Sequence, residues 1–137
     1  MYEVIVGVDC GLKRIGWAKK IGELILPIEP IIRKNRNQAA LELESELKQL
    51  GANKLVVGIP DTSFVDSSLE ARLESKKRIL HFINLVNFSG EIIFVNEDNT
   101  SIEALDNLKH LPKKKRQIAQ KNGLIDSLSA CEILKRI

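Results

Sequence analysis

The sequence predicts an α/β fold in which a five-stranded mixed sheet, made of a three-stranded antiparallel meander and two parallel strands, carries helices on both faces. Two observations lead to this prediction. The N-terminal part contains three apolar segments separated only by short turns, which is typical of a meander. The rest of the chain alternates apolar segments of strand length with stretches of helical periodicity, as in βα crossover units.

The meander accounts for three strands, expected over residues 2–8, 14–20 and 23–28. The first is mainly β-branched and apolar, as in a buried central strand. Gly22 marks a hairpin turn between the second and third segments. Pro27 and Pro30 cannot donate backbone hydrogen bonds, so they place the third strand at the edge of the sheet or end it there.

The two crossover units follow. Residues 37–50 have a leucine-rich stripe and a stop at Gly51, which predicts a helix, and residues 54–59 form the next apolar strand. A capping box at Ser67 and Glu70 opens a second helix. Its inward side chains are expected to be Leu69, Leu73, Leu80 and Ile83.

The last third of the chain begins with an apolar strand over residues 91–95. A second capping box, at Thr100 and Glu103, predicts a further helix. Residues 110–121 read as a basic loop, and the final helix is expected to run from an Asn122 cap to about Arg136.

Length and charge narrow the class of protein. At 137 residues, the chain is expected to form a single domain over residues 1–137. The net charge of +3 is unevenly spread, because residues 109–137 hold eight Lys or Arg against two acids. Such an asymmetry favours a polyanionic partner such as nucleic acid, although a solvated basic C-terminus has the same composition.

Other classes of protein are disfavoured. Cys10 and Cys131 form no CxxC pair, which argues against a disulfide framework or structural zinc. We expect Cys10 to be packed, and His81 and His110 to be surface residues. The first residues lack the layout of a signal peptide, and no apolar run has the ~20 residues of a membrane span. The expected location is therefore the cytoplasm, away from membranes.

Three carboxylates occupy related topological places. Asp9 and Glu97 follow apolar strands that are expected to be parallel, so both should lie at the same edge of the sheet. Asp126, in the first turn of the last helix, can approach that edge. Three acids together repel one another unless Mg²⁺ or Mn²⁺ binds between them, and such a site performs phosphodiester hydrolysis.

Each acid also has a simpler explanation. Asp9 precedes the turn at Gly11, where Asp is common. Glu97 stands in a polar run that solvent alone explains, and Asp126 suits the positive end of a helix dipole. The argument for a metal site depends on the three positions together.

Four motifs resemble those of the YqgF/RuvX family of RNase H-fold nucleases. The opening GVDCGLKRIGWA is similar to the first family motif, and VVGIP at 56–60 to the second. FVNEDNTSIEA at 94–104 is similar to the third motif, and DSLSACEIL at 126–134 to the fourth. They occur in the family order and span almost the whole chain.

The resemblance implies an RNase H-like fold, a kinship with Holliday-junction resolvases, and a role in maturing the 5′ end of 16S ribosomal RNA. It implies that Asp9, Glu97 and Asp126 are the catalytic residues and metal ligands. The substrate-binding residues would then be Lys13, Arg14, Thr100, Lys113, Lys114, Lys115 and Arg116. Structured RNA, in free form or in pre-ribosomal particles, is the expected partner ahead of DNA.

The third motif departs from the family pattern. The family usually has Asp-Glu-Arg where this chain has Asn96-Glu97-Asp98, so an acid and an Arg are missing. If that Arg holds phosphate, another cation must replace it. Two alternatives therefore remain beside RNA cleavage: a resolvase that cuts four-way DNA, and an RNA- or ribosome-binding module whose metal site has decayed. Trp17 could stack on a base, but packing against the sheet is the expectation.

Overall fold

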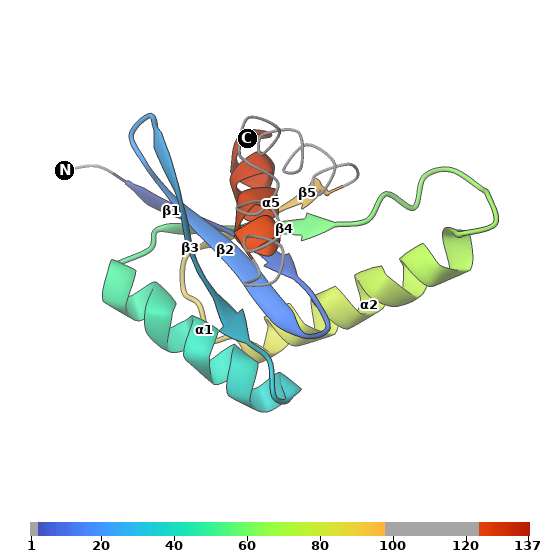
Figure 1. Ribbon diagram of the computed structural model, residues 1–137, viewed down its shortest axis with the longest axis horizontal. Coiled ribbons are helices and arrows are strands. Elements are labelled where there is room, and N and C mark those ends of the chain that lie inside the picture. Colours follow the sequence, from blue (N-terminus) through green and yellow to red (C-terminus); the bar gives the residue numbers. More distant parts are fainter. Residues whose placement is uncertain (1–2, 98–123) are drawn as a thin grey trace, which may run out of the picture.

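The computed structural model describes residues 3–97 and 124–137, and Figure 1 shows the arrangement of their elements. Five strands and three helices are present in these ranges. In chain order they are β1 (Val4–Cys10), β2 (Arg14–Ile21), β3 (Leu24–Ile32), α1 (Arg36–Leu50), β4 (Lys54–Ile59), α2 (Leu69–Leu85), β5 (Glu91–Asn96) and α5 (Leu124–Leu134).

The strands form one sheet in the order β3-β2-β1-β4-β5. β1, β2 and β3 pair antiparallel, whereas β4 pairs parallel to β1 and β5 pairs parallel to β4. This confirms the predicted mixed sheet. Since β1, β4 and β5 are parallel, their carboxyl ends meet at one edge, which we call the carboxyl edge.

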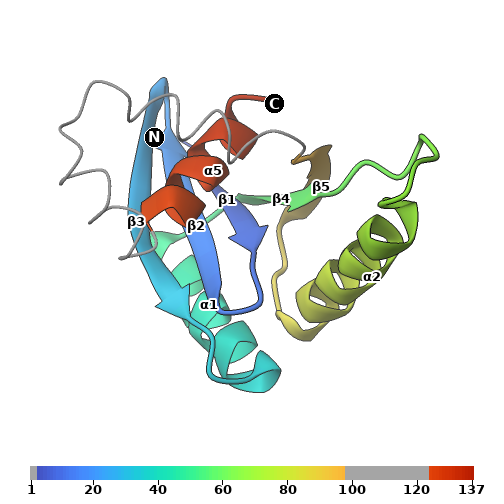
Figure 2. The same cartoon turned by 45° about the vertical axis from the view of Figure 1, so that its right-hand side comes forward.

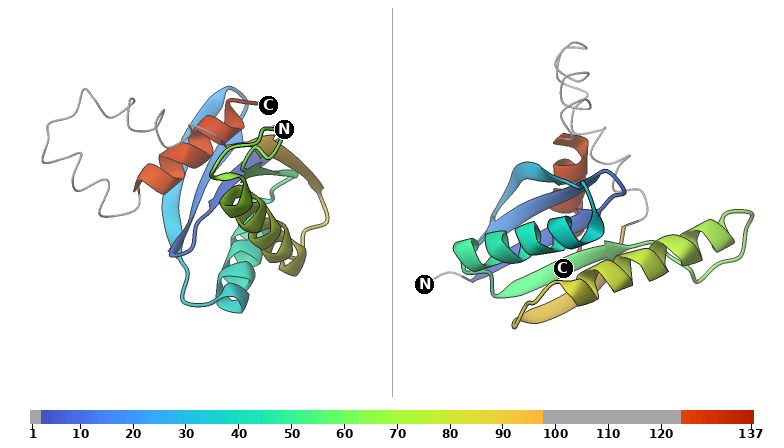
Figure 3. Two further views of the ribbon diagram at one scale, coloured as in Figure 1. Left: turned by 90° about the vertical axis from the view of Figure 1, so that its right-hand side faces the viewer. Right: turned by 90° about the horizontal axis from the view of Figure 1, so that it is seen from below.

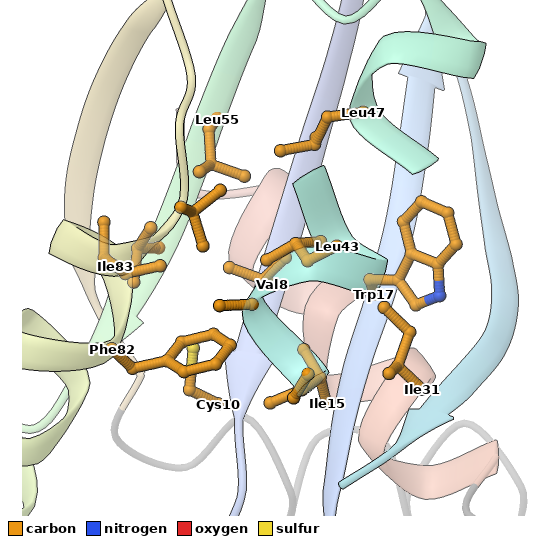
Figure 4. Packing of buried hydrophobic residues seen from close by; sticks show 14 of the residues in the cluster. Val8, Cys10, Ile15, Trp17, Ile31, Leu43, Leu47, Leu55, Phe82 and Ile83 are labelled. Atoms are coloured by element: carbon orange, nitrogen blue, oxygen red, sulfur yellow. The ribbon is translucent and has the colours of Figure 1, made fainter. Parts of the chain in front are cut away.

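Helices cover both faces, as predicted: α1 and α2 lie on one face of the sheet and α5 on the other (Figure 2). Successive side chains of β1 point to opposite faces of the sheet. Val6, Val8 and Cys10 belong to the larger core, which contains buried residues of α1 and α2. Figure 4 shows part of this core. A smaller cluster on the opposite face joins Ala18 and Val56 to residues of α5.

α1 has well-formed ends. Asn35 and Gln38 make a reciprocal capping box at the N-terminus, which satisfies backbone donors that the first turn leaves open. At the other end, Gly51 adopts the left-handed conformation (φ 64°) that terminates a helix. The predicted stop at Gly51 is thus confirmed, and the helix begins at Arg36, one residue before the predicted start.

α2 differs from the prediction. It begins at Leu69 after Ser68, whose side chain makes no capping hydrogen bond, so the predicted Ser67 box is wrong. The predicted core residue Leu73 is 49% exposed, whereas Ile79, Phe82 and Ile83 are buried. The N-terminal half of α2 reaches beyond the carboxyl edge (Figure 3), so its inward stripe has no sheet to cover.

β3 is longer than predicted and contains both Pro27 and Pro30. It is an edge strand, so these residues disturb no second ladder, and the chain does not end the strand at either of them. A register shift in the β2–β3 pairing falls between Ile15 and Trp17. The Gly22 turn is confirmed, with φ of 60°.

Several predictions fall outside the described residues: the Thr100–Glu103 capping box, the basic loop and the Asn122 cap. Within residues 3–97 and 124–137, no helix is long and apolar enough to cross a membrane.

Candidate active site

Asp9 lies in β1 one residue before the strand ends, and it pairs in register with Gly16 of β2. The prediction placed it just after the strand, but backbone pairing continues to Cys10. Because its neighbours Val8 and Cys10 point into the α1/α2 core, Asp9 points to the α5 face. Burial raises the pKa of Asp9 to about 6, a hydrogen bond with Glu97 opposes that shift, and the charge of Asp126 adds to it.

Glu97 directly follows β5, and its backbone N–H donates to the carbonyl of Ile59 at 2.9 Å. This bond continues the β4–β5 pairing past the end of the strand and fixes the residue beside β4. Gly58 makes room for it, since a Cβ at residue 58 would stand 3.0 Å from the Glu97 Cβ. The Glu97 side chain therefore reaches Asp9, two strands away, and forms the hydrogen bond that influences its pKa.

Asp126 belongs to the first turn of α5, as predicted. The helix is held very close to the sheet at this point, because a Cβ on Gly16 would come within 2.2 Å of the Asp126 carbonyl carbon and oxygen. Since Gly16 pairs with Asp9, the close approach sets Asp126 beside Asp9. Asp126 Oδ2 lies 3.4 Å from Arg14 Nε. Burial raises the pKa of Asp126, and the Arg14 charge opposes that shift.

The structure therefore brings the three predicted acids to one end of the sheet on its α5 face. The acids do not form a preorganised metal site. Among the described residues, no group of three or more His, Cys, Asp or Glu side chains is positioned to hold a metal ion. Asp9 and Glu97 share a hydrogen bond, which requires a proton between them, while Asp126 faces Arg14. A cation could replace that proton, and three carboxylates are the oxygen donors that Mg²⁺ and Mn²⁺ prefer.

Of the predicted substrate-binding cations, Lys13 and Arg14 lie within the described residues. Lys13 is exposed in the β1–β2 turn, and Arg14, at the start of β2, makes the ion pair with Asp126. A further cation, which the motif comparison had not identified, lies near Glu97: Arg136 Nη1 donates to the Asn96 carbonyl at 2.5 Å. The remaining predicted contacts, Thr100 and the Lys113–Arg116 run, lie outside the described residues.

The loop after β4 borders the carboxyl edge and is fastened by Arg72 of α2. The Arg72 guanidinium donates to the carbonyls of Asp61 and Phe64 and pairs with Asp66 Oδ1 at 2.6 Å. It also lies 4.0 Å from the centroid of the Phe64 ring. Sequence reasoning missed this residue, because its partners are loop carbonyls that no motif reveals.

Three other residues lie where the sequence predicted them. Trp17 is only 3% exposed and donates from Nε1 to the Glu29 carbonyl at 2.7 Å, so it packs on the sheet and cannot stack on a base. Cys10 is buried, and burial raises the pKa of its thiol far above the usual range, which leaves it un-ionised. His81 is exposed on α2, as predicted.

A family model described as "RuvX: Holliday junction resolvase" matches residues 3–137. The chain belongs to the RuvX family. A RuvX relative from Helicobacter hepaticus is 52% identical over 99% of this chain and 95% of its own length. One from Helicobacter pylori (strain P12) is 50% identical over 97% and 93%, and one from Campylobacter lari is 42% identical over 95% and 93%. All three carry the name "Putative pre-16S rRNA nuclease".

The RuvX fold also has a counterpart among solved structures. The fowlpox virus Holliday junction resolvase superposes with a TM-score of 0.55, at 16% sequence identity, over 97% of this chain and 95% of the viral one. At that identity the likeness shows the fold alone. It confirms the resolvase-type, RNase H-like architecture that the motifs implied.

Proposed function

We propose that this RuvX-family protein is a divalent-metal-dependent nuclease that hydrolyses phosphodiester bonds in structured RNA, with the 5′ end of pre-16S ribosomal RNA as its substrate. The observation that carries this proposal is the meeting of Asp9, Glu97 and Asp126 at one end of the sheet. The names of relatives about half identical in sequence support the choice of RNA.

The site residues have distinct roles in this proposal. Asp9 is held on the central strand, so its carboxylate has the most rigid support and anchors the site. With a pKa of about 6, it is ionised at neutral pH and able to bind a cation. Glu97 and Asp126 complete an oxygen-rich set on either side of it. Bound Mg²⁺ or Mn²⁺ would acidify the attacking water and stabilise the charge on the leaving oxygen.

The cations position the substrate. Arg14 presents a planar guanidinium beside Asp126, suited to a phosphate oxygen next to the scissile bond, and Lys13 supplies a point charge from the neighbouring turn. Arg136 brings a positive charge next to Asn96, the first residue of the altered third motif, from which the family Arg is missing. We assign Thr100 and the Lys113–Arg116 run to further substrate contacts, which would strengthen binding in a salt-dependent way.

The decisive experiment offers a pre-16S RNA fragment and a four-way DNA junction to the protein, each with Mg²⁺ or Mn²⁺, and repeats every reaction with Asp9→Asn. Metal-dependent cutting of the RNA that Asp9→Asn abolishes is the expected result. Cleavage by Asp9→Asn at the wild-type rate would refute the assignment of the site.

The family description favours a second candidate, resolution of four-way DNA junctions. Symmetric cutting of the junction at protein concentrations that leave the RNA intact would establish it. The non-enzymatic alternative, a binding module with a decayed metal site, predicts RNA binding without any cleavage. It also predicts that isothermal calorimetry detects no Mn²⁺ binding that depends on Asp9.

A further inference from the structure

Four cationic residues lie on segments that contact one another: the β1–β2 turn, the β3–α1 connection, the start of α1, and α2. They are Lys13, Arg33, Arg36 and Arg78, and we call them the cation cluster. The cluster lies at the carboxyl edge but on the α1/α2 side of the sheet, whereas the three acids lie on the α5 side. Only Lys13 has a place in the site described above.

Arg33 connects two of these elements. Its backbone N–H donates to the Lys13 carbonyl at 2.9 Å, and its Nη1 donates to the Gly11 carbonyl at 3.3 Å. Its guanidinium carbon also lies 5.4 Å from the centroid of the Phe82 ring of α2, within cation–π range. The Arg33 guanidinium is thus held between the turn and α2, and no carboxylate of residues 3–97 or 124–137 forms an ion pair with it.

The other two members are Arg36, the first residue of α1, and Arg78 of α2. Arg36 Nη1 lies 2.9 Å from His81 Nε2. Arg78 precedes His81 by three residues and Phe82 by four, so helical periodicity sets it on the same side of α2, one turn nearer the carboxyl edge. Its Nε is buried and has no hydrogen-bond partner among the described residues. A buried donor without a hydrogen-bond partner lowers the stability of the fold. Its presence at Arg78 therefore points to a role other than stabilisation.

The cluster adjoins the acids through Cys10. Cys10 directly follows Asp9 in β1, and its buried side chain belongs to the same core as Phe82, over whose ring the Arg33 guanidinium lies. Figure 4 shows Cys10 and Phe82 at the same end of the core. In the described part of the chain, no member of the cluster forms an ion pair with a carboxylate. Neighbouring cations without an acidic partner among the described residues repel one another, and a bound anion would relieve this repulsion.

We propose that the cation cluster binds the phosphodiester backbone of the nucleic acid, so that the strand crosses the carboxyl edge from the acids on the α5 side to α2 on the other. The inference rests on the proposed nuclease function, because it assigns the surface that holds the substrate next to the scissile bond. The projecting half of α2, which carries Lys76, extends this surface beyond the sheet.

Binding is measured without cleavage. A fluorescein-labelled RNA hairpin of about 25 nucleotides is titrated in EDTA with Asp9→Asn and with the same protein that also carries Arg33→Gln, Arg36→Gln or Arg78→Gln. Each second substitution is expected to weaken binding several-fold and to lower the slope of log affinity against log salt by about one, the loss of one phosphate contact. Lys48→Gln, which removes a charge at the far end of α1, is the matched control and should change neither quantity.

The melting temperature separates a binding role from a structural one. Arg78→Met removes the buried, unpaired donor, so it should raise the melting temperature while weakening RNA binding. Parent-like affinity and salt slope in the Arg36→Gln and Arg78→Gln proteins would overturn the inference, even if the wild-type enzyme cuts RNA. Conversely, a cluster-dependent loss of binding would support it even if no cleavage is found. The same loss measured with a DNA hairpin would identify the backbone, and not the sugar, as the feature recognised.

Discussion

Gly16 and Asp126 are in direct backbone contact across the interface between β2 and α5. A methyl group on Gly16 would stand 2.2 Å from the Asp126 carbonyl carbon and oxygen, so the first turn of α5 can lie where it does only because residue 16 has no side chain. Asp9 is the register partner of Gly16 on β1. One glycine therefore controls the separation of two acids that are far apart in the sequence.

Gly16→Ala should consequently damage the site more than the fold. The helix must shift, at a cost of about 1–3 kcal/mol in the free energy of unfolding. A displacement of Asp126 by about 1 Å is enough to lower the cleavage rate about 100-fold. Gly51→Ala is the control: it meets no atom within 4 Å but has φ of 64°, so it should cost about 1 kcal/mol and leave cleavage intact. Equal losses of activity in the two variants would contradict this prediction.

Asp9→Asn should stabilise the metal-free protein at neutral pH. The pKa of Asp9 is about 6 in the folded protein and near 3.8 when unfolded, so the folded state binds more protons between those values. Wild-type stability must therefore fall as the pH rises from about 4 to 6. Asn has no such titration, so the variant should gain about 1–3 kcal/mol at pH 7. Urea unfolding in EDTA at pH 4 and pH 7 tests this, and a gain of the same size at both pH values would contradict it.

Divalent metal should reverse the difference in stability between the wild type and Asp9→Asn. Because Mn²⁺ would bind the folded protein and not the unfolded chain, 10 mM Mn²⁺ should stabilise the wild type by about 1.4 kcal/mol if the dissociation constant is about 1 mM. Asp9→Asn, Glu97→Gln and Asp126→Asn should lose this gain. Glu42→Gln, which removes an exposed acid of α1, should keep it. Thermal unfolding with and without Mn²⁺ provides the measurement, and a uniform shift in all variants would argue against the site.

Arg14→Gln should have opposite effects on metal and on substrate. Arg14 is paired with Asp126 at 3.4 Å, and both side chains are about one-third exposed, so the pair contributes only about 0.2–1 kcal/mol. Its loss should release Asp126 and strengthen Mn²⁺ binding by up to about 5-fold. Cleavage should nevertheless fall at least 10-fold if Arg14 holds a phosphate. Calorimetry and single-turnover cleavage separate the two effects, and weaker Mn²⁺ binding would show that Arg14 supports the metal site instead of competing with it.

Patterns of apolar residues were sufficient to predict the sheet. The turn at Gly22 and the helix stop at Gly51 were also predicted, because each depends on a backbone conformation that favours glycine. The main error in the prediction was the inward face of α2. Periodicity placed Leu73 inward, yet the sheet does not extend beneath it, and a one-dimensional pattern contains no information on where a neighbouring strand ends.

The sequence by itself determined the strands, their order of connection and the three acids, because hydrophobic spacing and turn chemistry are local properties of the chain. Tertiary structure alone decided how the acids meet: Glu97 reaches Asp9 across β4, and Asp126 approaches over Gly16. It also decided which cations have no acidic partner within residues 3–97 and 124–137, as in the cluster of Arg33, Arg36 and Arg78. Such pairings depend on distances of a few ångströms between segments that only packing brings together, and no local pattern encodes them.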